Sequence, residues 1–134
     1  MDPRRWRLDG QLAVVTGGSA GIGRAIAREL AGFGADLLLV GRDADALDEV
    51  REEIADLFPD RGLHTHVADL ADGTARGALL DRIEDLGEGP HILVNNAGGN
   101  LPRAATDYAE DEYRAIFELN VFAAFELCRQ LHPL

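Results

Sequence analysis

The chain has 134 residues, and 46% of them are hydrophobic, which suffices for one buried core but leaves no room for a separate second domain. Its formal net charge is −11 at pH 7, and nucleic acids are bound by clustered positive charge, so we expect no nucleic-acid partner. All 13 basic residues are Arg, and the sequence contains no Lys. No apolar stretch is long enough for a signal peptide or a membrane span, so we predict one cytoplasmic domain over residues 1–134.

Short apolar runs alternate with longer runs of helical periodicity, and this alternation predicts a parallel sheet covered by helices. The first run covers residues 12–16, ends in glycines and is followed by a helix over residues 21–33. A second strand, over residues 37–40, precedes an amphipathic helix that spans residues 47–57. The first half of the chain therefore predicts two successive strand-helix units.

Two further units follow in the second half of the chain. A third strand over residues 63–68 is followed by a helix whose apolar positions lie within residues 79–86. Glycine and proline then break the pattern before a fourth strand over residues 91–95, and the longest helical stretch spans residues 111–132. The predicted fold class is α/β, with a doubly wound parallel sheet that has helices on both faces.

The last helical stretch is apolar around much of its circumference. Asn120 lies among its apolar residues, and we expect this amide on the side that faces the sheet, where it needs hydrogen-bond partners. A helix that is apolar on most sides is expected to pack against the sheet and against a second surface, such as another subunit. One stripe would comprise Ile116, Phe117, Val121, Ala124, Cys128 and Leu131.

A glycine-rich turn connects the first strand to the first helix. Gly17 permits a sharp exit from the strand, Gly21 lets the backbone approach a ligand without a Cβ in the way, and Gly23 lets the helix pack closely. The N–H groups and the positive end of the helix would then face phosphate oxygens. The alternative is an ordinary strand-to-helix turn. The residues predicted to contact a dinucleotide here are Gly17, Ser19, Ala20, Gly21, Ile22 and Gly23.

The spacing of this turn is Gly-x-x-x-Gly-x-Gly, which differs from the general dinucleotide fingerprint and lacks the Gly-Lys-Ser/Thr ending of a P-loop. A second motif, Asn95-Asn96-Ala97-Gly98, ends the fourth predicted strand. Together the two motifs resemble those of the short-chain dehydrogenases/reductases, over the whole chain. Residues 95–108 look most like the tropinone-reductase-like branch of that family.

The resemblance implies a Rossmann-type sheet of strand order 3-2-1-4, with the cofactor in the crevice where the order reverses. It implies that Asp69, with Leu70, contacts the adenine; the alternative is that Asp69 only caps the end of its strand together with Asp72. Three residues of the second motif, Asn96, Ala97 and Gly98, would also border the cofactor.

The choice between the two nicotinamide cofactors is expected at the end of the second strand, which reads Val40-Gly41-Arg42-Asp43. Gly41 stands where NAD-dependent relatives carry an acid, and the Arg42 guanidinium suits the 2′-phosphate in charge and shape. Asp43 is a second candidate for the ribose hydroxyl, but we interpret it as the cap of the next helix. Although Ala20 offers no second basic residue, we predict NADP(H) in preference to NAD(H).

The resemblance implies a catalytic Ser, a Tyr followed by Lys four residues later, and an Asn that positions a water in the proton relay. Asn120 matches the relay Asn; the alternative is an Asn bonded only to backbone. The only Ser is Ser19, in the glycine turn, and neither Tyr108 nor Tyr113 is followed by Lys. We therefore expect an N-terminal cofactor-binding portion, truncated after residue 134 and inactive alone. Two His residues, at positions 64 and 66, are too few for a metal site, and none is predicted.

The predicted function is that of an NADP-dependent oxidoreductase acting on a small-molecule ketone or secondary alcohol, with residues 99–108 beside the substrate. The resemblance implies a homo-oligomer, a dimer or tetramer, for the intact protein. Without a following strand, the fourth strand would be an exposed apolar edge. The alternatives are a non-catalytic dinucleotide-binding or regulatory module and, third, a separate chain that supplies Ser, Tyr and Lys.

Overall fold

The structure, a computed structural model, describes residues 3–87 and 89–133, so the predicted chain end at residue 134 lies outside it. The described residues form one parallel sheet of four strands, in the order β3-β2-β1-β4. This confirms the predicted α/β class and the strand order. The strands are β1 (Leu12–Thr16), β2 (Asp36–Gly41), β3 (Leu63–Val67) and β4 (Ile92–Val94), so no bound differs from the expected one by more than one residue.

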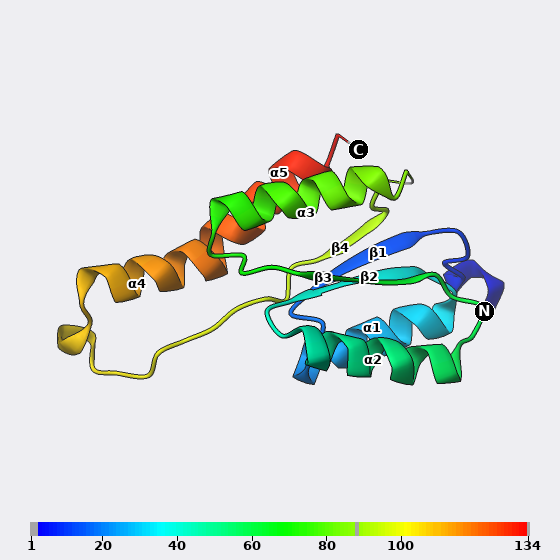
Figure 1. The fold of residues 1–134 in the computed structure, drawn as a ribbon, viewed down its shortest axis with the longest axis horizontal. Coiled ribbons are helices and arrows are strands. Elements are labelled where there is room, and N and C mark those ends of the chain that lie inside the picture. Colours follow the sequence, from blue (N-terminus) through cyan, green and yellow to red (C-terminus); the bar gives the residue numbers. More distant parts are fainter. Residues whose placement is uncertain (1–2, 88, 134) are drawn as a thin grey trace.

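Helices cover both faces of the sheet (Figure 1). On one face lie α1 (Gly21–Phe33) and α2 (Ala44–Leu57), and on the other lie α3 (Gly73–Asp85) and α5 (Ala123–Leu131). Side chains of β1 and β2 alternate between the two layers because successive strand residues point to opposite faces. Thus Val15 packs with the α1–α2 layer and Val14 with the α3–α5 layer, each fully buried. The two central strands are therefore continuous apolar runs, as expected of a parallel sheet covered on both sides.

The helix ends follow local chemistry. Asp43 begins α2 by accepting a hydrogen bond from the backbone N–H of Ala46 at 3.1 Å, which supports the interpretation of Asp43 as a helix cap. Asp72 begins α3 in the same way. Gly34 ends α1 in the left-handed conformation, with φ of 111°, a position where a side chain is disfavoured.

The predicted helical stretch over residues 111–132 is helical from Glu110 to Leu131, but it is not one uninterrupted α-helix. The chain forms α4 (Glu110–Phe117), a single π-helical turn over Glu118–Phe122, and then α5. A π turn places one extra residue per hydrogen bond, so it rotates the following helix relative to the preceding one and shifts the buried face. The predicted apolar stripe is therefore wrong in part: Phe117, Val121 and Cys128 are exposed. Leu131 is buried as expected, together with Ala123 and Leu127 of α5.

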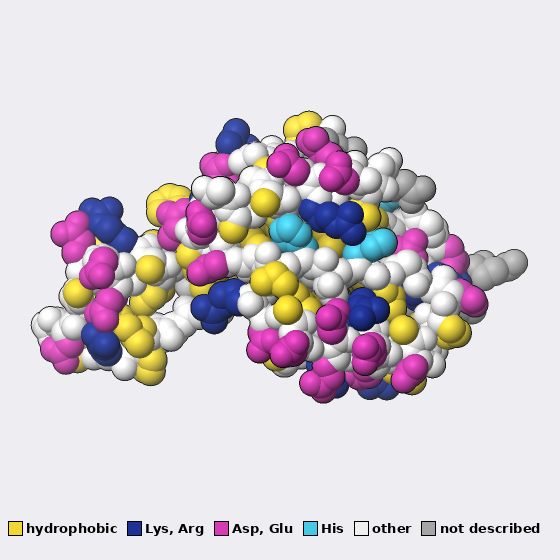
Figure 2. Space-filling view, viewed as in Figure 1, with side chains coloured by type: hydrophobic (Ala, Val, Ile, Leu, Met, Phe, Trp, Pro, Cys, Tyr) yellow, Lys and Arg dark blue, Asp and Glu magenta, His cyan; other side chains and the backbone are white. Residues whose placement is uncertain are grey.

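The segment between β4 and α5 projects from the body of the molecule (Figure 1). It runs from the end of β4 through a short 3-10 helix (Ala105–Asp107) into α4. A separate 3-10 helix (Pro3–Trp6), near the N-terminus, is not part of this segment. Figure 2 shows hydrophobic side chains exposed on this projection, and acidic side chains spread over the whole face rather than gathered in one patch. The exposed large apolar side chains of this segment are Leu101, Tyr113, Phe117, Val121 and Phe122, and Phe125 follows in α5.

None of the helices formed by residues 3–87 and 89–133 combines the length and the apolar character needed to span a membrane.

At the sheet edge, β4 is the outer strand, as expected, and its three residues are half-buried.

Candidate functional site

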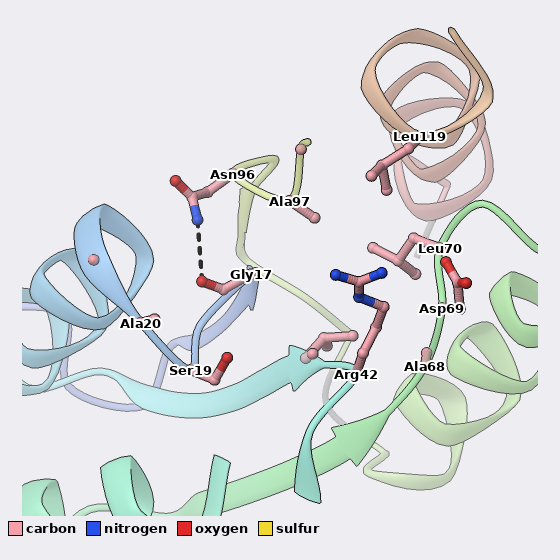
Figure 3. A pocket seen from close by; sticks show the side chains of 14 residues that line it. Gly17, Ser19, Ala20, Arg42, Ala68, Asp69, Leu70, Asn96, Ala97 and Leu119 are labelled. Carbon is pink, nitrogen blue, oxygen red and sulfur yellow. Dashed lines mark hydrogen bonds between the residues drawn. The ribbon is translucent and has the colours of Figure 1, made fainter. Parts of the chain in front are cut away.

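A cleft of about 390 Å³ lies over the carboxyl ends of the four strands (Figure 3). Each strand contributes the residues that follow it, because the carboxyl ends of parallel strands meet at one edge of the sheet. The glycine turn follows β1, and the remaining walls come mainly from residues at the ends of β2, β3 and β4. The lining residues are Gly17, Ser19, Ala20, Gly21, Val40, Gly41, Arg42, Ala68, Asp69, Leu70, Asn96, Ala97, Gly98 and Leu119.

The glycines of the turn are required by its backbone. Gly17 and Gly21 adopt positive φ angles of 63° and 52°, which residues with a side chain rarely adopt. A Cβ on Gly21 would meet no protein atom within 4 Å, so the missing side chain leaves open space. A Cβ on Gly23 would overlap the carbonyl oxygen of Gly17, so Gly23 lets α1 start directly against the turn.

The N-terminus of α1 has no capping side chain. Its N-cap residue, Ala20, has no side-chain acceptor, and the first turn contains no acidic residue. The first N–H groups of an α-helix have no partner within the helix, and here they lie beside the Ser19 hydroxyl at the cleft. These donors, with the positive end of the helix, form a site that suits an anionic oxygen.

Thr16 fixes the turn to the end of β4, a role that the sequence analysis did not find. Its side chain is 1% exposed; its hydroxyl donates to the carbonyl of Val94 and accepts from the backbone N–H groups of Asn96 and Ala97, at 3.1, 3.0 and 2.9 Å. The Asn96 amide donates in return to the carbonyls of Thr16 and Gly17, both at 3.1 Å. The signal for this role is a hydroxyl residue that ends an otherwise apolar strand.

Arg42 borders the cleft at the end of β2, and Figure 3 shows its guanidinium pointing into the cleft. Within the described part of the chain it forms no ion pair, although most other Arg residues there do. Its neighbour Asp43 is engaged as the cap of α2. The pocket thus contains a positive charge that no carboxylate of the described residues neutralises.

Asp69 and Leu70 follow β3 and line the cleft together. One oxygen of the Asp69 carboxylate accepts a hydrogen bond from the backbone N–H of Ala71 at 3.0 Å, so this side chain also shapes its own turn. Asp72 caps α3 independently. The capping interpretation and the ligand-contact interpretation of Asp69 are therefore compatible, because the second carboxylate oxygen has lone pairs to spare.

Asn120 lies in the π turn, and its amide is bonded only to backbone. Its oxygen accepts from the N–H of Gly99 at 3.2 Å, and its NH₂ donates to the carbonyls of Gly99 and Ile116, each at 2.8 Å. The expectation that Asn120 faces the sheet is wrong: the residue is exposed, because the π turn rotates it away from the buried side of α5. A Cβ on Gly98 would lie 2.7 Å from the Asn120 oxygen, so the second motif leaves room for this amide.

The structure brings together ten of the twelve predicted cofactor residues, those named in the lining above. Ile22 and Gly23 are not among the lining residues: Ile22 is 73% exposed at the start of α1, and Gly23 is buried behind the turn. The lining residues for which the sequence predicts no role are Val40, Ala68 and Leu119; Gly41 also lines the cleft, at the position expected to distinguish the two cofactors.

Within the described residues, no group of three or more His, Cys, Asp or Glu side chains could hold a metal ion. The two His residues of β3 are therefore not part of such a group. Burial lowers the pKa of His66, and the positive charge of Arg82 lowers it further. The neutral imidazole is therefore favoured in the folded protein.

A parallel sheet whose order reverses between β1 and β4, with a glycine turn at the reversal and a cleft at the carboxyl ends, defines a Rossmann-type fold. The sequence model of the short chain dehydrogenase family matches residues 11–134. The chain belongs to that family.

Curated relatives support the same assignment. A tropinone reductase homolog from Datura stramonium is 37% identical over 134 residues, which cover 98% of this chain and 48% of the relative. A tropinone reductase homolog from Arabidopsis thaliana is 37% identical over 135 residues, with 99% and 49% covered. The chain spans about half the length of the curated relatives it matches. The predicted resemblance to tropinone reductases is confirmed.

Solved structures share the fold closely. L-sorbose reductase from Gluconobacter frateurii, complexed with NADPH and L-sorbose, matches with a TM-score of 0.91 and 34% identity over 99% of this chain and 49% of that chain. A metagenomic short-chain oxidoreductase in complex with NADP matches with a TM-score of 0.87 and 35% identity, over 94% and 57% of the two chains.

Proposed function

We propose that this chain is the nucleotide-binding portion of an NADP(H)-dependent oxidoreductase that interconverts a small ketone and its secondary alcohol by hydride transfer. The observation that carries the proposal is the cleft over the four strand ends, where the glycine turn and the Arg42 guanidinium border one space. Membership of the short chain dehydrogenase family supports the reaction class.

The residues of the cleft fit the parts of a dinucleotide. The Ser19 hydroxyl and the uncapped start of α1 would hold the diphosphate, and the space beside Gly21 leaves room for it. The Asp69 carboxylate would accept a hydrogen bond from the adenine amino group. The second motif, with Asn96 and Ala97, would form the opposite wall.

The preference for NADP(H) over NAD(H) rests on the end of β2. Gly41 places no carboxylate beside the ribose, and Arg42 offers a fork of donors to a 2′-phosphate. The neighbouring acid, Asp43, instead accepts a hydrogen bond from the backbone N–H of Ala46 at the start of α2. The complexes of the two structural relatives, one with NADPH and one with NADP, support this choice.

Hydride transfer requires more than this chain contains. By family resemblance Asn120 would hold the relay water, but the 134 residues include no Lys, and their single Ser lies in the glycine turn. We therefore expect the chain alone to bind the cofactor and to reduce no ketone. Residues 99–108, which begin beside Asn120, would border the substrate in the intact protein.

Isothermal titration of the purified chain with NADPH and with NADH tests the proposal. The expected result is tighter binding of NADPH, and Arg42→Ala should remove most of that preference, about tenfold or more for a charge-assisted contact to phosphate. Arg114→Ala is a matched control, because Arg114 lies on α4, pairs with Glu110 and does not line the cleft. Equal affinity for the two cofactors, or tighter binding of NADH, would contradict the assignment.

A second candidate is a non-catalytic dinucleotide-binding or regulatory module, which the cleft alone would equally serve. The coding sequence downstream of residue 134 separates the two: a Ser followed by Tyr-x-x-x-Lys supports the oxidoreductase. A partner chain that supplied these residues would instead be revealed by ketone-dependent oxidation of NADPH in a mixture of the two chains.

For the intact protein we also propose a homo-oligomer, supported by the exposed apolar side chains of α4 and α5. Sedimentation velocity would measure its oligomeric state.

A further inference from the structure

We propose that Arg76 is a positioning residue of the cofactor cleft, which ties the loop after β3 to the π turn and so fixes two neighbouring parts of the cleft wall. The loop carries Leu70, and the π turn carries Leu119, and both of these side chains line the cleft. This inference rests on the proposed function, because it concerns the affinity of the same cleft for its nucleotide.

The Arg76 guanidinium makes two hydrogen bonds through different nitrogens. Its Nη1 donates to the backbone carbonyl of Leu70 at 2.7 Å, and its Nη2 donates to a carboxylate oxygen of Glu118 at 2.8 Å. The Arg76 side chain is only 13% exposed, and that of Glu118 is 37% exposed. Because the guanidinium is planar and its donors are fixed relative to one another, the two contacts hold their acceptors at a defined separation.

Neither acceptor belongs to the helix that carries Arg76. Arg76 lies in the first turn of α3, where its backbone N–H donates to the carbonyl of the N-cap residue Asp72. Leu70 is six residues earlier in the chain, and Glu118 is 42 residues later. The side chain therefore connects separate segments and does more than stabilise its own helix.

The position of Glu118 explains what the contact controls. Glu118 is the first residue of the π turn, Leu119 is the second, and Asn120 is the third. Asn120 bonds to Gly99 on the loop after β4, so the turn is held on one side by Asn120 and on the other by Glu118. The segment before it projects from the body (Figure 1), so these two contacts and the packing of α5 locate the turn.

The two leucines connect this contact to the cleft. Leu70 is 3% exposed and belongs to the buried cluster beneath α3 and α5, and Leu119 packs against the same cluster. Figure 3 shows both side chains at the cleft, with Leu119 descending from the helical segment above it. Loss of Arg76 would free both segments to move apart, and the cleft would lose its fixed width at this end.

Isothermal titration with NADPH tests this role, with folding checked separately by circular dichroism at the titration temperature. Arg76→Met should weaken NADPH binding about tenfold, by loss of two charge-assisted hydrogen bonds, while the variant remains folded. Glu118→Gln, which keeps one polar contact, should weaken binding less. Arg76→Lys should recover part of the affinity, since one ammonium group cannot reproduce the two-pronged contact.

Arg82→Met is the matched control, because Arg82 lies on the same helix and loses the same charge without lining the cleft. Its affinity for NADPH should equal that of the unchanged chain. Unchanged affinity in folded Arg76→Met would overturn the inference and leave the proposed function intact. If that variant fails to fold, unchanged affinity in both Glu118→Gln and Arg76→Lys overturns it equally. If the unchanged chain binds neither NADPH nor NADH, the proposed function fails, and this inference fails with it.

Discussion

Replacement of Thr16 by Val should destabilise the fold far more than the loss of one hydroxyl suggests. Val has nearly the shape of Thr, so the change isolates the hydroxyl. In the native structure that hydroxyl accepts from the N–H groups of Asn96 and Ala97 and donates to the carbonyl of Val94. The Asn96 N–H also donates to the carbonyl of Val94 at 3.0 Å, so the substitution leaves only the Ala97 N–H without an acceptor. A buried donor without a partner costs about 1–3 kcal/mol, which is the expected loss.

Urea unfolding of the variant, followed by circular dichroism, measures this loss as a lower midpoint at an unchanged slope. Thr16→Ser, which restores the hydroxyl but not the methyl group, should recover more than half of the loss. Thr106→Val is the control, because Thr106 is exposed in a 3-10 helix and such changes are worth about 0.5 kcal/mol or less. A loss below about 1 kcal/mol for Thr16→Val would show that water or backbone relaxation satisfies the Ala97 N–H, and the reasoning would be wrong.

Two further outcomes follow from the cap of α2 and from the edge strand β3. Asp43→Ala should lower the free energy of unfolding by about 1 kcal/mol and leave the ratio of NADPH to NADH affinity unchanged; a changed ratio would make Asp43 a ribose ligand. Because the pKa of His66 is lowered in the folded protein, the unfolded chain binds more protons than the folded one at pH values between the two pKa values. The protein therefore loses stability through His66 as the pH falls below about 6.5, the ordinary pKa of His. His66→Asn should therefore show a smaller loss of stability between pH 7 and pH 5 in urea titrations, and an identical loss would exclude the effect.

The strands and the first three helices could be predicted because local patterns and tertiary packing agree in them. The apolar run of residues 12–16 is buried on both faces, and the helix of residues 21–33 starts and ends where predicted. Asp43 could be recognised as a cap because capping depends on residues within one turn. In each case the information lies within a few residues of the feature.

The π turn could not be predicted because its apolar pattern fits a continuous α-helix equally well. One extra residue in a turn changes which side chains are buried, and nothing in the order Glu118-Leu119-Asn120 marks the insertion. The Asn120 amide and Gly99 meet across 21 residues, and Arg76 and Glu118 across 42. Such contacts depend on tertiary geometry, so the sequence predicts a role for Asn120 from its motif but not the hydrogen-bond partners of its amide.

The hydrogen bonds between Thr16 and Asn96 join backbone segments 80 residues apart, and the cleft forms only once they have closed. A chain in which only β1 and β2 have paired contains half of the cleft, and we expect it to bind no nucleotide. A nucleotide that binds the closed form alone would therefore stabilise the entire sheet, by about 2.7 kcal/mol at a concentration one hundred times its dissociation constant. Contacts between residues far apart in the sequence form slowly during folding. The ligand would therefore lower the unfolding rate more than it would raise the folding rate.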